Sequence, residues 1–115
     1  MQALPGLRTA NLLDESLLTE AERRGGVDAT CVARMRTLVM LARAAGSDGV
    51  LVTCNIYSSA VEQLAKEMAP YPLISVDEPM IREAVRMGPR VGVLATVAAG
   101  LAQQSTQLEA EAARR

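Results

Sequence analysis

Cys54 is the residue of this 115-residue chain whose type and setting are best suited to chemistry. It ends an apolar run and begins a polar one in the stretch "LVTCNIYSSAVEQL", residues 51–64. A thiolate is both a nucleophile and a proton carrier. Asn55, Ser58 and Ser59 follow it with amide and hydroxyl groups that can bind a carboxylate. The pattern is typical of a reactive thiol beside a binding site for an anion.

The elements around Cys54 favour this interpretation. "GVLVTC", Gly49–Cys54, is a continuous apolar run, as expected for a strand covered on both faces. In open α/β sheets, ligands bind outside the carboxyl ends of the strands. Ser59 and Glu62 form an S-x-x-E capping box, which predicts a helix whose first N–H groups point to the same place and favour a negative charge there. The alternative is that Cys54 only fills space, because cysteine is among the most often buried residue types.

Other catalytic arrangements are excluded or weaker. The chain has no histidine, which rules out Cys–His dyads, Ser–His–Asp triads and metal sites built on histidine. We expect no metal and no cofactor. Cys31 falls inside a predicted amphipathic helix and is expected to be structural. Four carboxylates near predicted strand ends could form the acidic cluster of a response-regulator-like protein, but helix and turn capping explains them equally well: Asp14, Glu15, Asp77 and Glu78.

The composition restricts the class of partner. The net charge is −1 and only 2% of the residues are aromatic, so we expect no nucleic-acid partner. Residues 91–108 form the longest uncharged stretch, but it is rich in Ala, Gly, Gln and Thr, and no transmembrane helix is predicted. The first ten residues lack the apolar segment of a secretory signal. We therefore expect a reduced, cytoplasmic protein without a membrane partner.

Strand and helix patterns alternate along the chain with short connections. Residues 1–115 are predicted to form a single α/β domain, with a parallel sheet and helices on both faces. Asp77 is expected to cap the helix that "DEPM" opens, with Pro79 in its first turn. The predicted strands are Ala10–Ser16, Gly49–Cys54, Pro72–Val76 and Arg90–Thr96, and the predicted helices cover 17–26, 28–46, 59–68, the stretch after Asp77 and the stretch from Ala98.

Three blocks in order carry a resemblance to a known family: "GVLVTCNIYSSAV", "PLISVDEPMIREAV" and "RVGVLATVAAGL". The chain resembles the aspartate/glutamate racemase superfamily, which includes hydantoin racemases and arylmalonate decarboxylases, from about Asn11 to Leu108. The resemblance implies a flavodoxin-like fold and cofactor-independent proton transfer at the carbon next to a carboxylate. In that family two thiols act on opposite faces of the substrate. Cys54 matches the cysteine of the first domain, and Asn55 and Thr96 match polar residues of the site.

The chain also departs from the family pattern. The second cysteine of the family belongs to a second domain, and Cys31 cannot replace it because it falls in a helix. The strand that opens the first domain, central in its sheet, has no counterpart before the "LLDES" stretch. The positions after Thr96 hold Ala98, Ala99 and Gly100, and Ile56 follows Asn55 where relatives carry Ser or Thr. We therefore expect a truncated first domain whose exposed sheet is covered by self-association, most simply as a dimer.

Two functions remain open from the sequence. One is a racemase-type enzyme in which Cys54 is catalytic and Asn55, Ser58 and Thr96 bind the substrate, a small carboxylate or amino acid. The other is a catalytically inactive domain that keeps the fold as a binding or structural module. A protein with one thiol could protonate from one side only, or share a site with a second copy of itself.

Overall fold

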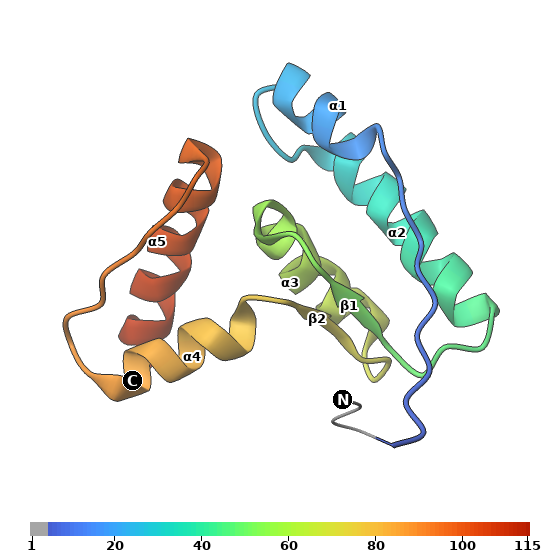
Figure 1. The fold of residues 1–115 in the computed structure, drawn as a ribbon. Helices are drawn as coiled ribbons and strands as arrows, with labels where there is room; N and C mark the ends of the chain where they lie inside the picture. The colour runs from blue at the N-terminus through green and yellow to red at the C-terminus, as the bar shows by residue number, and fades with distance from the viewer. Residues whose placement is uncertain (1–4) are drawn as a thin grey trace.

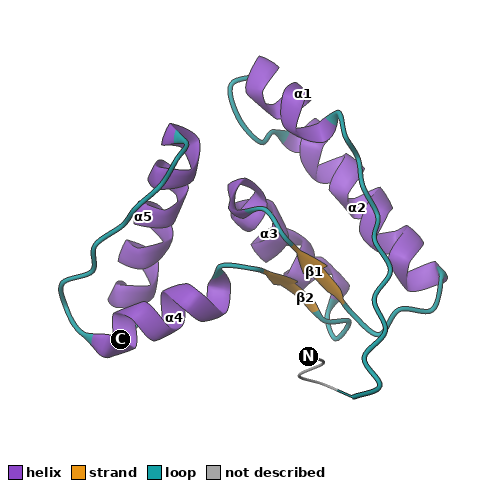
Figure 2. Ribbon diagram, in the orientation of Figure 1, coloured by secondary structure: helices purple, strands orange, loops and turns teal. Residues whose placement is uncertain are grey.

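The computed structural model describes residues 5–115 and contains five α-helices, one 3₁₀-helix and a two-stranded parallel sheet in that part of the chain (Figures 1 and 2). In chain order the elements are α1 (Leu17–Arg23), α2 (Ala29–Ala44), β1 (Val50–Val52), η1 (Asn55–Tyr57), α3 (Ser58–Met68), β2 (Leu73–Ser75), α4 (Glu78–Met87) and α5 (Ala98–Ala113).

The first two helices begin and end where the local sequence predicts. Gly25 and Gly26 follow α1 with φ values of 78° and 148°, which favour glycine and stop the helix. Asp28 caps α2, since its carboxylate accepts the N–H of Cys31 at 3.0 Å. Cys31 is 1% exposed and packs into the core, as a structural cysteine would.

The sheet consists of β1 and β2 in parallel, with Leu51 opposite Ile74. Helix α3 covers one face, and its Leu64 is 0% exposed at the centre of the core. On the other face Leu51 and Ile74 are 54% and 45% exposed. The prediction of helices on both faces is therefore wrong for these strands. The core beneath α3 is aliphatic, with one tyrosine: Leu17, Ala21, Cys31, Met35, Val39, Tyr57, Ala60, Val61, Leu64 and Leu73.

Two predicted strands, Ala10–Ser16 and Arg90–Thr96, are not strands in the structure. Residues 7–14 and 89–95 have no regular secondary structure. An apolar run makes a segment suitable for a sheet, but a strand also needs a neighbour to pair its backbone groups. Among the described residues only β1 and β2 pair with each other, so neither segment has such a neighbour.

Helix α5 is attached loosely. It packs against α4 and η1, yet it contains no buried residue. Two polar contacts tie its end to the rest of the chain: Arg114 lies 3.6 Å from Glu62 of α3, and the guanidinium of Arg115 donates to the carbonyl of Arg82 at 3.2 Å. Figure 1 shows that the connection from α4 to α5 runs on the side of α5 that faces away from the sheet.

Across residues 5–115, none of the helices has both the length and the apolar character needed to cross a membrane.

Candidate functional site

Cys54 lies just beyond the carboxyl end of β1, at the N-cap position of η1, where its backbone is extended (φ −127°, ψ 124°). Its side chain is half-buried, and its carbonyl accepts the N–H of Tyr57 at 3.4 Å. Both cysteines are free thiols. Cys54 thus lies at the strand end where the sequence predicted it, and the run of helical turns that begins at Asn55 starts directly after it.

The capping box predicted at Ser59 does not form. Helix α3 starts one residue earlier, at Ser58, and its N-cap position is held by Tyr57 without a side-chain hydrogen bond. Ser59 lies inside α3, and the 3₁₀ turn η1 precedes the helix directly, so the helical N–H groups begin nearer to Cys54 than the sequence pattern suggested.

Tyr57 is a neighbour of the thiol that the sequence analysis did not single out. It is 7% exposed, and burial raises the pKa of its phenol. Negative charge on Cys54, on Cys31 and on Asp14 raises this pKa further. The phenol therefore lies within electrostatic range of both thiols. The sequence could have indicated Tyr57 as a neighbour of the thiol, because it lies three residues after Cys54 and is one of two tyrosines in the chain.

Asn55 and Thr96, from distant parts of the sequence, meet in one cavity of about 590 Å³. The amide nitrogen of Asn55 lies against Gly100, so close that a Cβ on that glycine would be 3.4 Å away. No charged side chain lines the cavity; besides Asn55, Thr96 and Gly100 the lining residues are Met80, Ile81, Ala84, Val91, Gly92, Val93, Leu94, Ala95, Val97, Gln104 and Leu108. Cys54 is adjacent in sequence but is not among them.

Ser58 does not join this cavity. Its hydroxyl lies 2.8 Å from the carbonyl of Asn55 and 2.9 Å from a carboxylate oxygen of Asp77. It lines a second cavity of about 410 Å³, between α3, β2, α4 and α5. Ser58 therefore fixes the backbone that follows Cys54. The structure brings together two of the three predicted substrate-binding residues and separates the third.

Asp77 has a different role from the predicted cap. It precedes α4, but its side chain makes no capping hydrogen bond. The carboxylate is 2% exposed and accepts hydrogen bonds from Ser58 and, at 2.5 Å, from Ser75. These two hydroxyls satisfy a buried polar group that would otherwise be costly. The contact links η1 and α3 to the end of β2.

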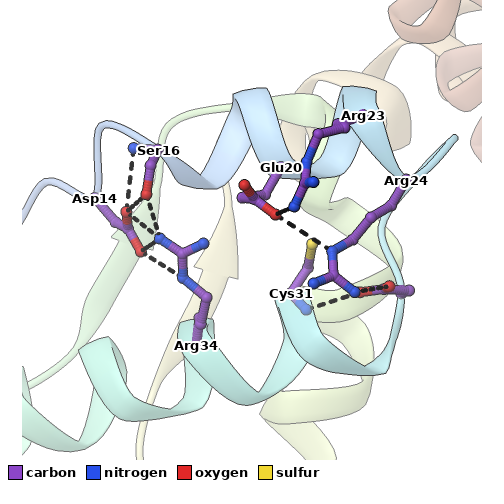
Figure 3. A network of polar contacts seen from close by, with 8 residues as sticks. Asp14, Ser16, Glu20, Arg23, Arg24, Cys31 and Arg34 are labelled. Atoms are coloured by element: carbon purple, nitrogen blue, oxygen red, sulfur yellow. Dashed lines mark hydrogen bonds and ion pairs between the residues drawn. The ribbon is translucent and has the colours of Figure 1, made fainter.

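The other predicted acidic position, Asp14, belongs to a separate network (Figure 3). Its carboxylate accepts two hydrogen bonds from the guanidinium of Arg34, at 2.6 and 3.0 Å, and also bonds Ser16. The hydrogen bond from Arg34 is the main cause that lowers the pKa of Asp14. Asp14 thus holds the start of α1 against α2. Within residues 5–115 no group of three or more Cys, Asp or Glu side chains is arranged to hold a metal ion.

The arrangement offers a half-buried thiol, an amide, a hydroxyl and the amino-terminal turn of α5 around one edge of the fold. Val97, the N-cap residue of α5, and Gly100, in its first turn, both line the cavity of Asn55 and Thr96. The free N–H groups of a helix start carry partial positive charge and favour a carboxylate. The site can therefore place an anion next to the residue that follows Cys54.

Comparison with known proteins identifies the family of the chain. Neither the curated proteins nor the solved structures gave a match to the chain. Comparison with protein families matched residues 13–112, which include β1, Cys54 and the whole cavity lining, to the Asp/Glu/hydantoin racemase family. Because the match spans most of the sequence, this chain belongs to the Asp/Glu/hydantoin racemase family.

Proposed function

We propose that the protein transfers a proton at the carbon next to a carboxylate, with the thiol of Cys54 as the acid–base group. The observation that supports this most is the position of Cys54, half-buried at the carboxyl end of β1 and directly before Asn55, which lines the cavity. Membership of the racemase family supports the same chemistry.

In this proposal the substrate carboxylate binds at the start of α5. Asn55 and Thr96 line the cavity together with Val97 and Gly100, at the start of α5 where the helical N–H groups are free. The same donors would stabilise the negative charge that develops on the carboxylate when the neighbouring carbon loses its proton.

Because the proposed site contains a single thiol, that of Cys54, the stereochemical outcome of the reaction is limited. The thiolate of Cys54 takes the α-proton and leaves a thiol and an enolate; the thiol exchanges its proton with water and then returns a solvent proton to the same face. The result is exchange of the α-hydrogen with solvent and retained configuration. Inversion needs a second acid on the opposite face, which a second copy of the chain could supply. Protonation after a decarboxylation needs only Cys54.

The test is hydrogen–deuterium exchange of the α-proton, followed by NMR in D₂O with a panel of amino acids and small 2-substituted carboxylates. We expect exchange with the wild-type protein, loss of exchange in Cys54→Ser, and retained exchange in Cys31→Ser, which changes the buried thiol outside the site. Full exchange in Cys54→Ser would remove the thiol from the mechanism.

A binding module without catalysis is the second candidate. It is favoured by Ala98, Ala99 and Gly100, which place no polar side chain in the first turn of α5. This function predicts saturable carboxylate binding that is equal in the wild type and in Cys54→Ser, without exchange in either protein. Isothermal titration of both proteins with the same panel separates the two functions.

A further inference from the structure

The chain exposes more surface than a compact protein of its size. Its accessible surface is 8407 Å², whereas a folded monomer of 12.2 kDa is expected to expose about 6,100 Å². The radius of gyration, 15.2 Å, also exceeds the value of about 13 Å expected for this length. The excess of about 2,300 Å² is larger than the area of about 800 Å² that one partner buries in a standard interface.

Part of this surface is an open strand edge. The N–H of Val50 donates to the carbonyl of Pro72 at 2.9 Å. The carbonyl of Val52 accepts the N–H of Val76 at 3.0 Å. Because backbone groups alternate along a strand, those of Leu51 face the edge of β1 that points away from β2. Among the described residues no strand pairs with that edge.

The two edges of the sheet differ in access. The outward backbone groups of β2 belong to Leu73 and Ser75, which are 5% and 4% exposed and line the cavity beside α5. Those of β1 belong to Leu51, 54% exposed, and to Thr53, also exposed. The edge of β1 is therefore the one that another strand can reach.

A segment with the composition of a strand forms no strand within residues 5–115. Residues 91–96, "VGVLAT", are continuously apolar apart from the final threonine, and Leu94 is fully exposed at 101%. Such a run is typical of a strand with both faces covered. This segment and α5 line one cavity, whereas α5 and β2 line the other, so α5 lies between the segment and its own sheet (Figure 1). Pairing within one chain would require α5 to move.

We propose that two copies of this chain associate by strand exchange, in which residues 91–96 of each copy pair with the outer edge of β1 in the other. The pairing would satisfy the backbone of Leu51 and bring Leu94 or Val93 onto the bare face beside the Leu51 side chain. Residues 50–54 and 91–97 carry no charge, so no charged group is desolvated, and the net charge of −1 gives little repulsion between copies. The inference does not depend on the proposed thiol chemistry.

The first experiment measures mass by multi-angle light scattering at micromolar concentrations, with Val93→Pro and Leu94→Pro beside the wild type. Consecutive N–H groups of a strand face opposite sides, so one of these two prolines must remove a donor of the new ladder. We expect a wild-type dimer and a monomer for one proline variant. Val93→Thr and Leu94→Thr keep the N–H and the preference for strand, and both should remain dimers.

A monomeric wild type, or dimers in both proline variants, would overturn the proposal.

A second measurement does not depend on variants. Amide hydrogen exchange should protect Leu51 and residues 91–96 at concentrations that give the dimer, and the protection should vanish on dilution. Unprotected amides in a dimeric sample would show that the copies meet elsewhere. Cys54→Ser should leave the mass unchanged, so failure of the proposed enzyme and failure of the proposed dimer are distinguishable.

Discussion

The hydroxyl of Ser58 lies 2.9 Å from a carboxylate oxygen of Asp77, across 19 positions of the sequence. Both residues are buried, and Ser58 also contacts the carbonyl of Asn55 at 2.8 Å. The residue that follows Cys54 is therefore fixed to the end of β2 by one buried polar cluster. Local sequence rules assign Asp77 to helix capping, whereas the fold uses it to join two strand ends.

Replacing the buried carboxylate should destabilise the protein. Asp77→Ala leaves the hydroxyl of Ser75 without its acceptor and Ser58 with the carbonyl of Asn55 alone, and we expect a loss of about 1–3 kcal/mol in the free energy of unfolding. Asp77→Asn keeps an acceptor oxygen and should lose less. Urea titration measures both. Glu78→Ala, at an exposed residue that pairs with Arg82 at 2.8 Å, is the control and should lose about 0.5 kcal/mol or less.

The ion pair between Asp14 and Arg34 should make stability depend on acid pH. The hydrogen bond from Arg34 holds the pKa of Asp14 below its ordinary value of 3.8. A carboxylate with a lowered folded-state pKa stabilises the protein at pH above that ordinary value, and this stabilisation disappears as the pH falls through the folded-state pKa. Asp14→Asn should therefore be less stable at about pH 7 and lose less stability on acidification below about pH 4.

The measurement for Asp14 is urea unfolding over a pH series, for the wild type and for Asp14→Asn. The exposed carboxylate of Asp48 provides the control, and Asp48→Asn should follow the wild-type curve. Parallel curves for the wild type and Asp14→Asn would contradict the role given to the contact with Arg34.

The two thiols should differ in access. Cys54 is half-buried at a strand end, whereas Cys31 is 1% exposed in α2. Iodoacetamide should therefore modify Cys54 first in the native protein and reach Cys31 only when the core opens. Peptide mass spectrometry of samples taken over time reports the order. Equal rates of modification for the two thiols in the folded protein would contradict the packing described for α2.

The sequence predicted those elements whose signals are local. Asp28 caps α2, paired glycines end α1, and Val61 and Leu64 line the buried face of α3, as their spacing indicates. The position of Cys54 at the end of β1 follows from the apolar run that precedes it.

The features that the sequence did not predict depend on contacts between distant residues. Arg90–Thr96 has a strand-like composition, but it becomes a strand only if another strand pairs with it, and the local sequence does not determine that. The same holds for Asp77, where capping was the local expectation and two serines from other elements determine the outcome. Ser58 was grouped with Asn55 by proximity in sequence, yet the two residues line different cavities.

The absence of buried side chains in α5 has a consequence for how the protein would capture a ligand. A helix of 16 residues with so little core contact can detach while α1–α3 and the strands stay folded. Because α5 forms a wall of the cavity with Asn55 and Thr96, that cavity would exist only while the helix is docked. In the proposed function, a bound carboxylate would therefore stabilise the docked position of α5, and the measured affinity would include the free energy of docking the helix.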